Sequence, residues 1–148
     1  MKNHYKSFFG KNCALIITSD YNTSSFYLNF IQEKGNQQWE TYKEGLTLSL
    51  NLSEICDISE ILEKDKGNKR IIHVYKGEKK DFWFGFEKKN EDWVFSIKGR
   101  SINKITRDDI RSHQKSFDKG ELRLLKKLLF HIEDEFIEFT TKGKKNEK

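Results

Sequence analysis

Several residue types that often shape a fold are missing or scarce in this chain. It contains no proline and only two cysteines, Cys13 and Cys56. The cysteines have neither C-x-x-C spacing nor neighbouring histidine pairs, so we expect two small, largely buried side chains and no bound metal or other cofactor. Because proline is absent, turns should be marked by Gly, Asn and Asp, with continuous strands or helices between them.

Long apolar runs and catalytic signatures are also lacking. No segment approaches the roughly 18 apolar residues of a membrane span, and the opening residues MKNHYKSFFGKN lack the apolar block of a secretory signal. We therefore expect no membrane partner and a cytoplasmic or nucleoid-associated protein, or a nuclear or organellar one in a eukaryote. The scattered histidines and the absence of a Gly-rich phosphate loop or a G-x-S-x-G motif do not favour an enzyme.

The aromatic content and the charge distribution are more informative. The chain has 148 residues, among them twelve Phe, five Tyr and three Trp, which is enough for a hydrophobic core. Its net charge is +5. Residues 1–68 carry seven Lys/Arg against nine Asp/Glu, whereas residues 69–148 carry 21 against 14. A surface that binds a polyanion should therefore lie mainly on the second half.

The first half of the chain changes from strand-like to helix-like periodicity. Alternating or short apolar runs predict strands at 13–19, 25–32, 37–43 and 46–52. Asn51 and Glu54 have the spacing of a capping box, and Ile55, Ile58 and Ile61 follow at helical intervals. This pattern predicts an amphipathic helix that ends near residues 66–68.

The second half repeats the same order. Strands are predicted at 70–76, 81–88, 92–98 and 110–117, followed by a helix from about 118 to 139. The sequence thus predicts an α+β fold of two repeated units, each a four-stranded antiparallel sheet plus a helix (ββββα-ββββα). We expect a single domain over residues 1–139 with repeats at about 5–67 and 68–139, and a flexible polar tail at 140–148.

Alternation along the strands also predicts which side chains face away from the core. Tyr27, Asn29, Tyr42 and Trp83 fall on that second face, whereas we assign seven aromatics to the core: Phe26, Phe30, Phe82, Phe84, Phe86, Trp93 and Phe95. For Tyr27 and Trp83 the pattern leaves a core position open as well, because a sheet covered on both faces buries such rings. If they are exposed, unpaired bases could stack on them while cations hold the phosphates.

Basic residues near these strands are the candidates for phosphate contacts. The candidates are Lys69, Arg70, Lys88, Lys98 and Arg100. Lysine at strand ends also serves solubility and protects sheet edges, so most of these residues fit that role equally well. Lys98 and Arg100 stand apart because they follow Val94 and Ser96 on the face opposite Phe95. These patterns favour single-stranded nucleic acid as the partner.

One stretch of the chain resembles a known family. The segment YLNFIQEKGNQQWETYKEGLTLSLNLSEICDISEIL, with its Gly turn, its Gln-aromatic-acid segment and its strand-to-helix entry, resembles the Whirly family of single-stranded-DNA-binding proteins. KGELRLLKKLLFHIEDEFI looks like the family's second helix, and GKNCAL matches in part a Lys-Gly-Lys-Ala-Ala-Leu strand. Lys11 and Gln38 lie in the matching segments, and the resemblance adds them to the candidates.

The resemblance implies a homotetramer packed through its helices, with single-stranded DNA bound between the sheets of adjacent subunits. The implied function is binding with little sequence preference, in replication, repair, recombination or transcription. Single-stranded RNA is an alternative, because a related fold occurs in mitochondrial guide-RNA-binding proteins. A different alternative is an oligomeric protein-interaction scaffold that uses the same strand surfaces and the long second helix.

Overall fold

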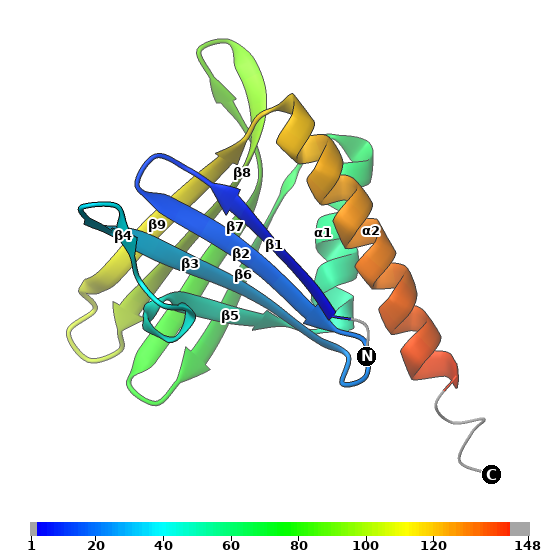
Figure 1. Cartoon of the computed structure of the whole chain (residues 1–148), viewed down its shortest axis with the longest axis horizontal. Helices are drawn as coiled ribbons and strands as arrows, with labels where there is room; N and C mark the ends of the chain where they lie inside the picture. The colour runs from blue at the N-terminus through cyan, green and yellow to red at the C-terminus, as the bar shows by residue number, and fades with distance from the viewer. Residues whose placement is uncertain (1–2, 143–148) are drawn as a thin grey trace.

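The computed structural model describes residues 3–142, which form two antiparallel sheets and two α-helices (Figure 1). The first half contains β1 (Asn3–Phe9), β2 (Cys13–Asp20), β3 (Ser25–Gly35), β4 (Gln38–Trp39), β5 (Leu46–Leu50) and α1 (Leu52–Lys64). The second half contains β6 (Asn68–Tyr75), β7 (Glu78–Lys89), β8 (Asp92–Asn103), β9 (Asp109–Phe117) and α2 (Lys119–Lys142). The predicted α+β class, with two antiparallel sheets and two helices, is confirmed.

The first sheet differs in detail from the predicted one. It has five strands in the order β1-β2-β3-β4, and β5 also pairs with β3. Strand β1 was not predicted because, among its described side chains, only Phe8 reaches the core. The predicted strand at 37–43 is wrong: only Gln38 and Trp39 pair with β3, and Tyr42–Glu44 form a turn of 3₁₀-helix. The backbone N–H of Thr41 donates to Glu44 Oε1 over 2.8 Å, which stabilises this turn at the expense of a longer strand.

The second sheet follows the prediction more closely. Its strands lie in sequence order, β6-β7-β8-β9, and β7 pairs with β8 along its whole length. The hairpin between them turns at Asn90 and Glu91, both with positive φ. That backbone conformation matches the twist of a tight hairpin and suits asparagine.

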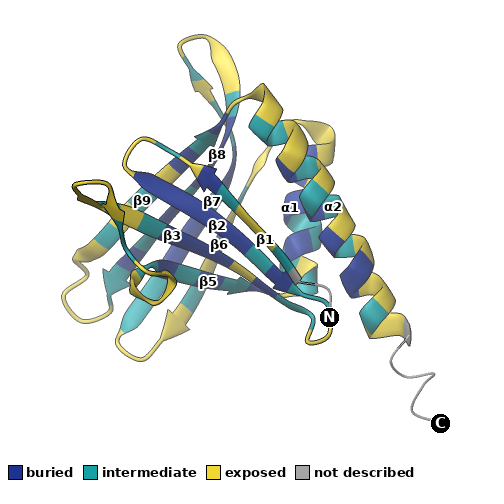
Figure 2. Ribbon diagram, viewed as in Figure 1, coloured by how far each residue is buried: buried dark blue, intermediate teal, exposed yellow. Residues whose placement is uncertain are grey.

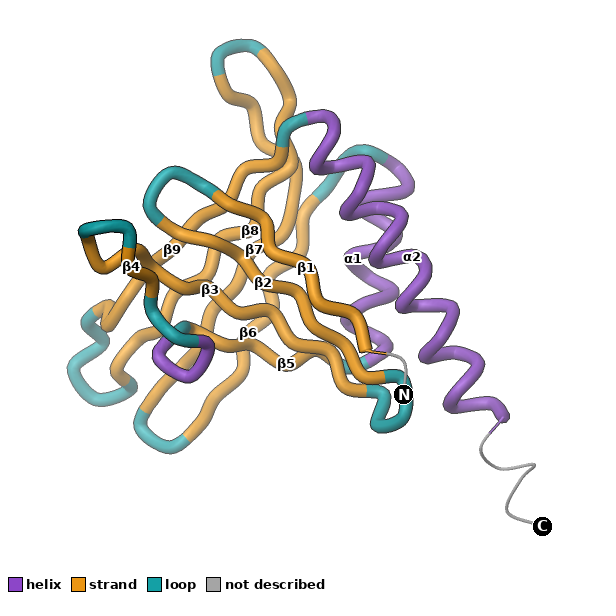
Figure 3. Tube along the Cα trace, viewed as in Figure 1, coloured by secondary structure: helices purple, strands orange, loops and turns teal. Residues whose placement is uncertain are grey.

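The two helices lie together at one end of the sheets (Figure 3). The predicted capping box of α1 is confirmed, because Glu54 N–H donates to Asn51 Oδ1 and Asn51 N–H donates to Glu54 Oε1. Asp118 and Glu121 form an equivalent pair at the start of α2. The buried stripes of the helices consist of Ile55, Ile58, Ile61 and Leu62 in α1 and Leu125, Leu129, Ile132 and Phe136 in α2.

The core lies between the inner faces of the sheets and the helices (Figure 2). Six of the seven aromatics assigned to it pack there, with Phe86 only partly buried. Trp93 is the exception, because 68% of it is exposed. It has the alternation of a core residue but lies opposite Lys88, beyond the last core pair of Phe86 and Phe95. Periodicity gave its face correctly but could not show where the core ends.

The remaining structural predictions concern the ends of the chain and the membrane. Helix α2 runs to Lys142, so residues 140–142 of the predicted flexible tail are helical, and residues 143–148 lie outside the described residues. Among the described residues, no helix has the length and apolar character needed to cross a bilayer.

Candidate nucleic-acid interface

The outer face of the second sheet brings four of the predicted residues together. Phe82 and Phe84 of β7 point into the core, so Trp83 between them points outward. The register places Arg70 of β6 on one side of Trp83 and Lys98 of β8 on the other. Arg100 lies two positions further along β8 on the same face. The aromatic ring therefore has a cation on each neighbouring strand, and a third cation lies diagonally from it on β8.

Trp83 and Lys98 interact directly. The Lys98 ammonium lies 5.0 Å from the centre of the indole ring, within the range of a cation–π contact. The same Nζ donates to Glu87 Oε1 over 2.8 Å. Burial of Glu87 opposes its ionisation, but hydrogen bonds from Lys98 and Ser96 outweigh this effect and lower its pKa. Lys98 is thus held over the ring, with its side chain 40% exposed.

A buried carboxylate orients the two arginines. Asp81 is only 5% exposed, and its Oδ1 accepts from Arg70 Nε over 3.1 Å. Its Oδ2 accepts from Arg100 Nε and Nη2 over 3.2 and 3.0 Å. Arg100 Nη1 also lies 3.7 Å from Asp109 Oδ1, and the side chains of Arg70 and Arg100 remain 59% and 42% exposed. Guanidinium N–H groups fixed in this way suit a phosphate.

The same face is hollowed at this point. Arg70, Asp81, Trp83, Lys98, Arg100 and Ser112 line a depression of about 320 Å³, together with Gly99. Arg100 is shared with a second depression of about 450 Å³, which Lys79, Lys104 and Arg107 also line. These three residues were not among the predicted candidates. Lys79 could have been found from its two-residue spacing relative to Asp81 and Trp83, whereas Lys104 and Arg107 lie in the β8–β9 connection.

The outer face of the first sheet carries the tyrosines. Tyr27 and Tyr42 are 38% and 36% exposed, and Thr18 connects them. Thr18 is the β2 partner of Tyr27, and its Oγ1 lies 3.3 Å from the hydroxyl of Tyr42. Tyr5 of β1 pairs with Thr18 from the other side and is 66% exposed. Because β1 was not predicted, Tyr5 was missed as a member of this row.

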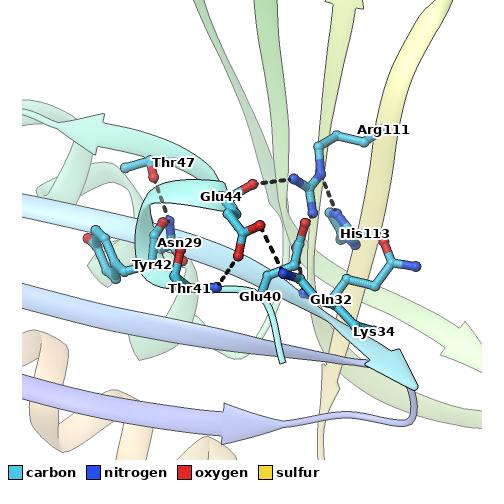
Figure 4. A network of polar contacts seen from close by, with 10 residues as sticks. All are labelled: Asn29, Gln32, Lys34, Glu40, Thr41, Tyr42, Glu44, Thr47, Arg111 and His113. Atoms are coloured by element: carbon cyan, nitrogen blue, oxygen red, sulfur yellow. Dashed lines mark hydrogen bonds and ion pairs between the residues drawn. The ribbon is translucent and has the colours of Figure 1, made fainter. Parts of the chain in front are cut away.

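Asn29 corrects one of the sequence predictions. It was expected on the exposed face with Tyr27, but it is fully buried, because the segment from Trp39 to Gly45 folds over this part of the sheet. Its Nδ2 donates to the carbonyl of Tyr42 and to Thr47 Oγ1 (Figure 4). Asn29 therefore holds Tyr42 in place and does not offer its own amide to a ligand.

Exposed aromatics continue along the first sheet towards β4. Phe9 is 62% exposed, and its ring packs edge-on against Trp39 with centres 5.8 Å apart. Gln38 is exposed beside Trp39. Lys11 lies in the β1–β2 turn and, with residues of β9, lines a depression of about 290 Å³. Lys11 and Gln38 are therefore accessible, and the depression beside Lys11 shares Ser112 with the one around Trp83.

Two predicted basic residues lie on the opposite face of the second sheet from Trp83. Lys69 is the β6 partner of Phe84, and its Nζ pairs with Asp57 of α1 over 3.3 Å. Lys88 alternates with Phe84 and Phe86 along β7. The structure does not bring either residue to the face that carries Trp83, Lys98 and Arg100.

Arg111 of β9 joins the two sheets at the end remote from the helices (Figure 4). Its Nη1 donates to the carbonyl of Glu44 over 2.7 Å and its Nη2 to Glu40 Oε1 over 2.6 Å. Burial opposes ionisation of Glu40, but the bonds from Arg111 and from the Gln32 backbone outweigh it and lower the pKa of Glu40. This clamp fixes the loop that carries Tyr42 relative to the second sheet.

Comparison with known proteins defines the fold class of this arrangement. The chain has a Whirly-like fold: it superposes on WHY1 from Arabidopsis thaliana with a TM-score of 0.73 and 13% identity, over 93% of this chain and 92% of that one. The plant transcriptional regulator PBF-2 gives 0.72 and 14%, over 95% and 86%. A guide-RNA-binding protein complex bound to its RNA gives 0.62 and 11%, over 86% and 87%.

Comparison of the sequence alone gave no match. No family profile and no curated protein matches this chain. The Whirly-like resemblance of the fold is confirmed by the shared three-dimensional structure, at identities too low to transfer residue roles.

Proposed function

We propose that this protein binds single-stranded nucleic acid with little sequence preference, and that its ligand is single-stranded DNA. The observation that carries the proposal is the outer face of the second sheet, where Trp83 stands between Arg70, Lys98 and Arg100. An aromatic ring offers a stacking surface for any base, and cations around it follow the phosphates. Replication, repair, recombination and transcription are the processes in which such binding would serve.

The first sheet supplies a second aromatic surface. Tyr5, Tyr27 and Tyr42 surround Thr18, and Phe9 and Trp39 extend the surface towards β4. We propose a homotetramer packed through its helices, in which this surface of one subunit faces the basic surface of its neighbour. Leu124 and Ile137 of α2 support this assembly, because they are 44% and 43% exposed in the single chain. A strand bound between subunits would contact both surfaces.

The proposed activity is binding, without catalysis. The charged groups at the centre of the basic face are tied to one another, with Asp81 bonded to two arginines and Glu87 bonded to Lys98. A carboxylate engaged in this way orients cations and is poorly placed to transfer protons.

Fluorescence anisotropy with labelled oligo-dT tests this proposal. We expect tighter binding of the single strand than of a duplex of equal length, and an affinity that falls steeply as salt rises. Equal affinity for both forms, or binding unchanged by salt, would contradict the proposal. Complete absence of binding would instead favour the protein-interaction scaffold.

RNA is the second candidate ligand, and the structural similarity to the guide-RNA-binding complex favours testing it. Oligo-U and oligo-dU of equal length differ only in the 2′-hydroxyl, so a direct comparison isolates recognition of the sugar. Preferential binding of oligo-U would replace DNA by RNA as the ligand.

A further inference from the structure

Two histidines and a glutamate from opposite ends of the chain meet beside the helices. His4 comes from β1, whereas His131 and Glu135 come from α2. His4 Nε2 lies 2.8 Å from Glu135 Oε1, and His131 Nε2 lies 3.3 Å from Glu135 Oε2. The two imidazole rings are 5.1 Å apart, edge to face. Both rings therefore direct a nitrogen at the same carboxylate.

This donor set suits a transition metal. Two imidazole nitrogens and one carboxylate oxygen form a common three-residue set for Zn²⁺, and a four-residue spacing on a helix places His131 and Glu135 on one face. The candidate ligand atoms all lie within 4.8 Å of one another. In a tetrahedral site with metal–ligand bonds of about 2.1 Å, the ligand atoms lie about 3.4 Å from one another. Rotation of the side chains can achieve this separation.

The burial of Glu135 also favours a cation here. The Glu135 side chain is only 8% exposed, and the interactions seen for its two oxygens in the described part of the chain are with the imidazoles. A divalent ion would compensate a buried carboxylate more fully than N–H donors do. His131 is 58% exposed, so an ion can enter from solvent and retain a position for water.

We propose that His4, His131 and Glu135 bind a transition-metal ion of the Zn²⁺ type, which joins the N-terminal edge strand to the C-terminal helix. This three-residue set was not predicted from the sequence, because His4 and Glu135 are 131 positions apart. The site lies on β1 and α2, away from the basic face of the second sheet. It can therefore be tested without any nucleic acid.

Thermal unfolding of the chelator-treated full chain, with and without ZnCl₂, tests the site. We expect a saturable rise in melting temperature at one Zn²⁺ per chain, because an ion bound only by the folded state stabilises it. The rise should be lost in His4→Gln and His131→Gln. MgCl₂ should produce no rise, since Mg²⁺ prefers oxygen ligands.

His73→Gln is the matched control variant. His73 Nε2 also contacts a helix carboxylate, Glu54 Oε2, over 3.0 Å, but these two residues do not belong to a three-ligand cluster in the described part of the chain. The variant should keep the full response to Zn²⁺. The proposal is overturned if the wild type shows no Zn²⁺-dependent rise, if His131→Gln shows the same rise, or if His73→Gln abolishes it.

Cobalt provides a direct view of the ligands. Co²⁺ substituted into the wild-type site should give the visible absorption of a tetrahedral nitrogen–oxygen environment, and His131→Gln should lose it. An identical spectrum in the two proteins would place the ion elsewhere and overturn the assignment.

Discussion

Arg111 Nε donates a hydrogen bond of 2.8 Å to Nε2 of His113. An arginine can only donate, so Nε2 of His113 must be the acceptor and the ring must be neutral. The ring also stacks on Phe30 at the inner surface of the sheets. Burial, followed by the charge of Arg111, lowers the pKa of His113, with Glu40 opposing the effect.

The lowered pKa of His113 predicts a loss of stability in mild acid. The unfolded chain takes up a proton near pH 6.5, the ordinary value for histidine, while the folded chain resists it. Stability should therefore fall as pH drops through about 6.5, until the folded-state pKa is passed. We expect His113→Gln, which can still accept from Arg111 but does not titrate, to show a smaller fall.

Urea denaturation midpoints at pH 7.5 and pH 5.5 would measure this difference, since the other histidines contribute equally to both proteins. An equal pH dependence in the wild type and His113→Gln would refute the role of His113.

Replacement of Trp83 should weaken nucleic-acid binding. Loss of one stacking platform costs about 1–3 kcal/mol, so Trp83→Ala should raise the Kd for oligo-dT about 5- to 150-fold. Trp93→Ala is the matched control, because Trp93 is an exposed tryptophan on the neighbouring strand, near the hairpin turn. An equal loss in both variants would show that the site is not centred on Trp83.

Arg70 and Arg100 should contribute to the salt dependence of nucleic-acid binding. For single strands, each phosphate contact adds about 0.7 to the slope of log affinity against log salt. Arg100→Gln should therefore reduce the slope by about 0.7, and the double variant with Arg70→Gln by about twice that. Arg123 is exposed on α2, so Arg123→Gln serves as the control and should leave the slope unchanged. If the slope is unaltered in all the variants, Arg70 and Arg100 do not contact phosphates.

Gly99 should be intolerant of a side chain. A Cβ at this position would lie 2.6 Å from Cζ of Phe82, which is fully buried. Gly99→Ala should therefore cost about 1–3 kcal/mol in the free energy of unfolding. Gly120→Ala, in the first turn of α2 with 3.6 Å to its nearest neighbour, should be neutral or stabilising. Urea titration of both variants tests this difference. If Gly99→Ala is as stable as the wild type, the Phe82 ring moves to accommodate the added methyl group.

The sequence by itself determined most of the elements and most of their faces. Alternation placed Trp83 opposite Phe82 and Phe84 and placed Lys98 opposite Phe95, but left open whether the face of Trp83 is exposed. The Asn51–Glu54 spacing marked the start of α1. These features depend on residues a few positions apart, so local periodicity and capping chemistry are sufficient to predict them. The edge strand β1 escaped prediction because a strand that contributes one side chain to the core has little periodic signal.

The tertiary structure decided what covers each face and which distant residues meet. Asn29 is buried because the loop before β5 folds over its strand, whereas Trp93 is exposed because the core ends before it is reached. The Arg111 clamp, the pair of arginines on Asp81 and the meeting of His4 with Glu135 all join strands or helices through long-range packing. A repeat of two or of 3.6 residues shows which side chains share a face, but the opposing surface comes from another part of the chain.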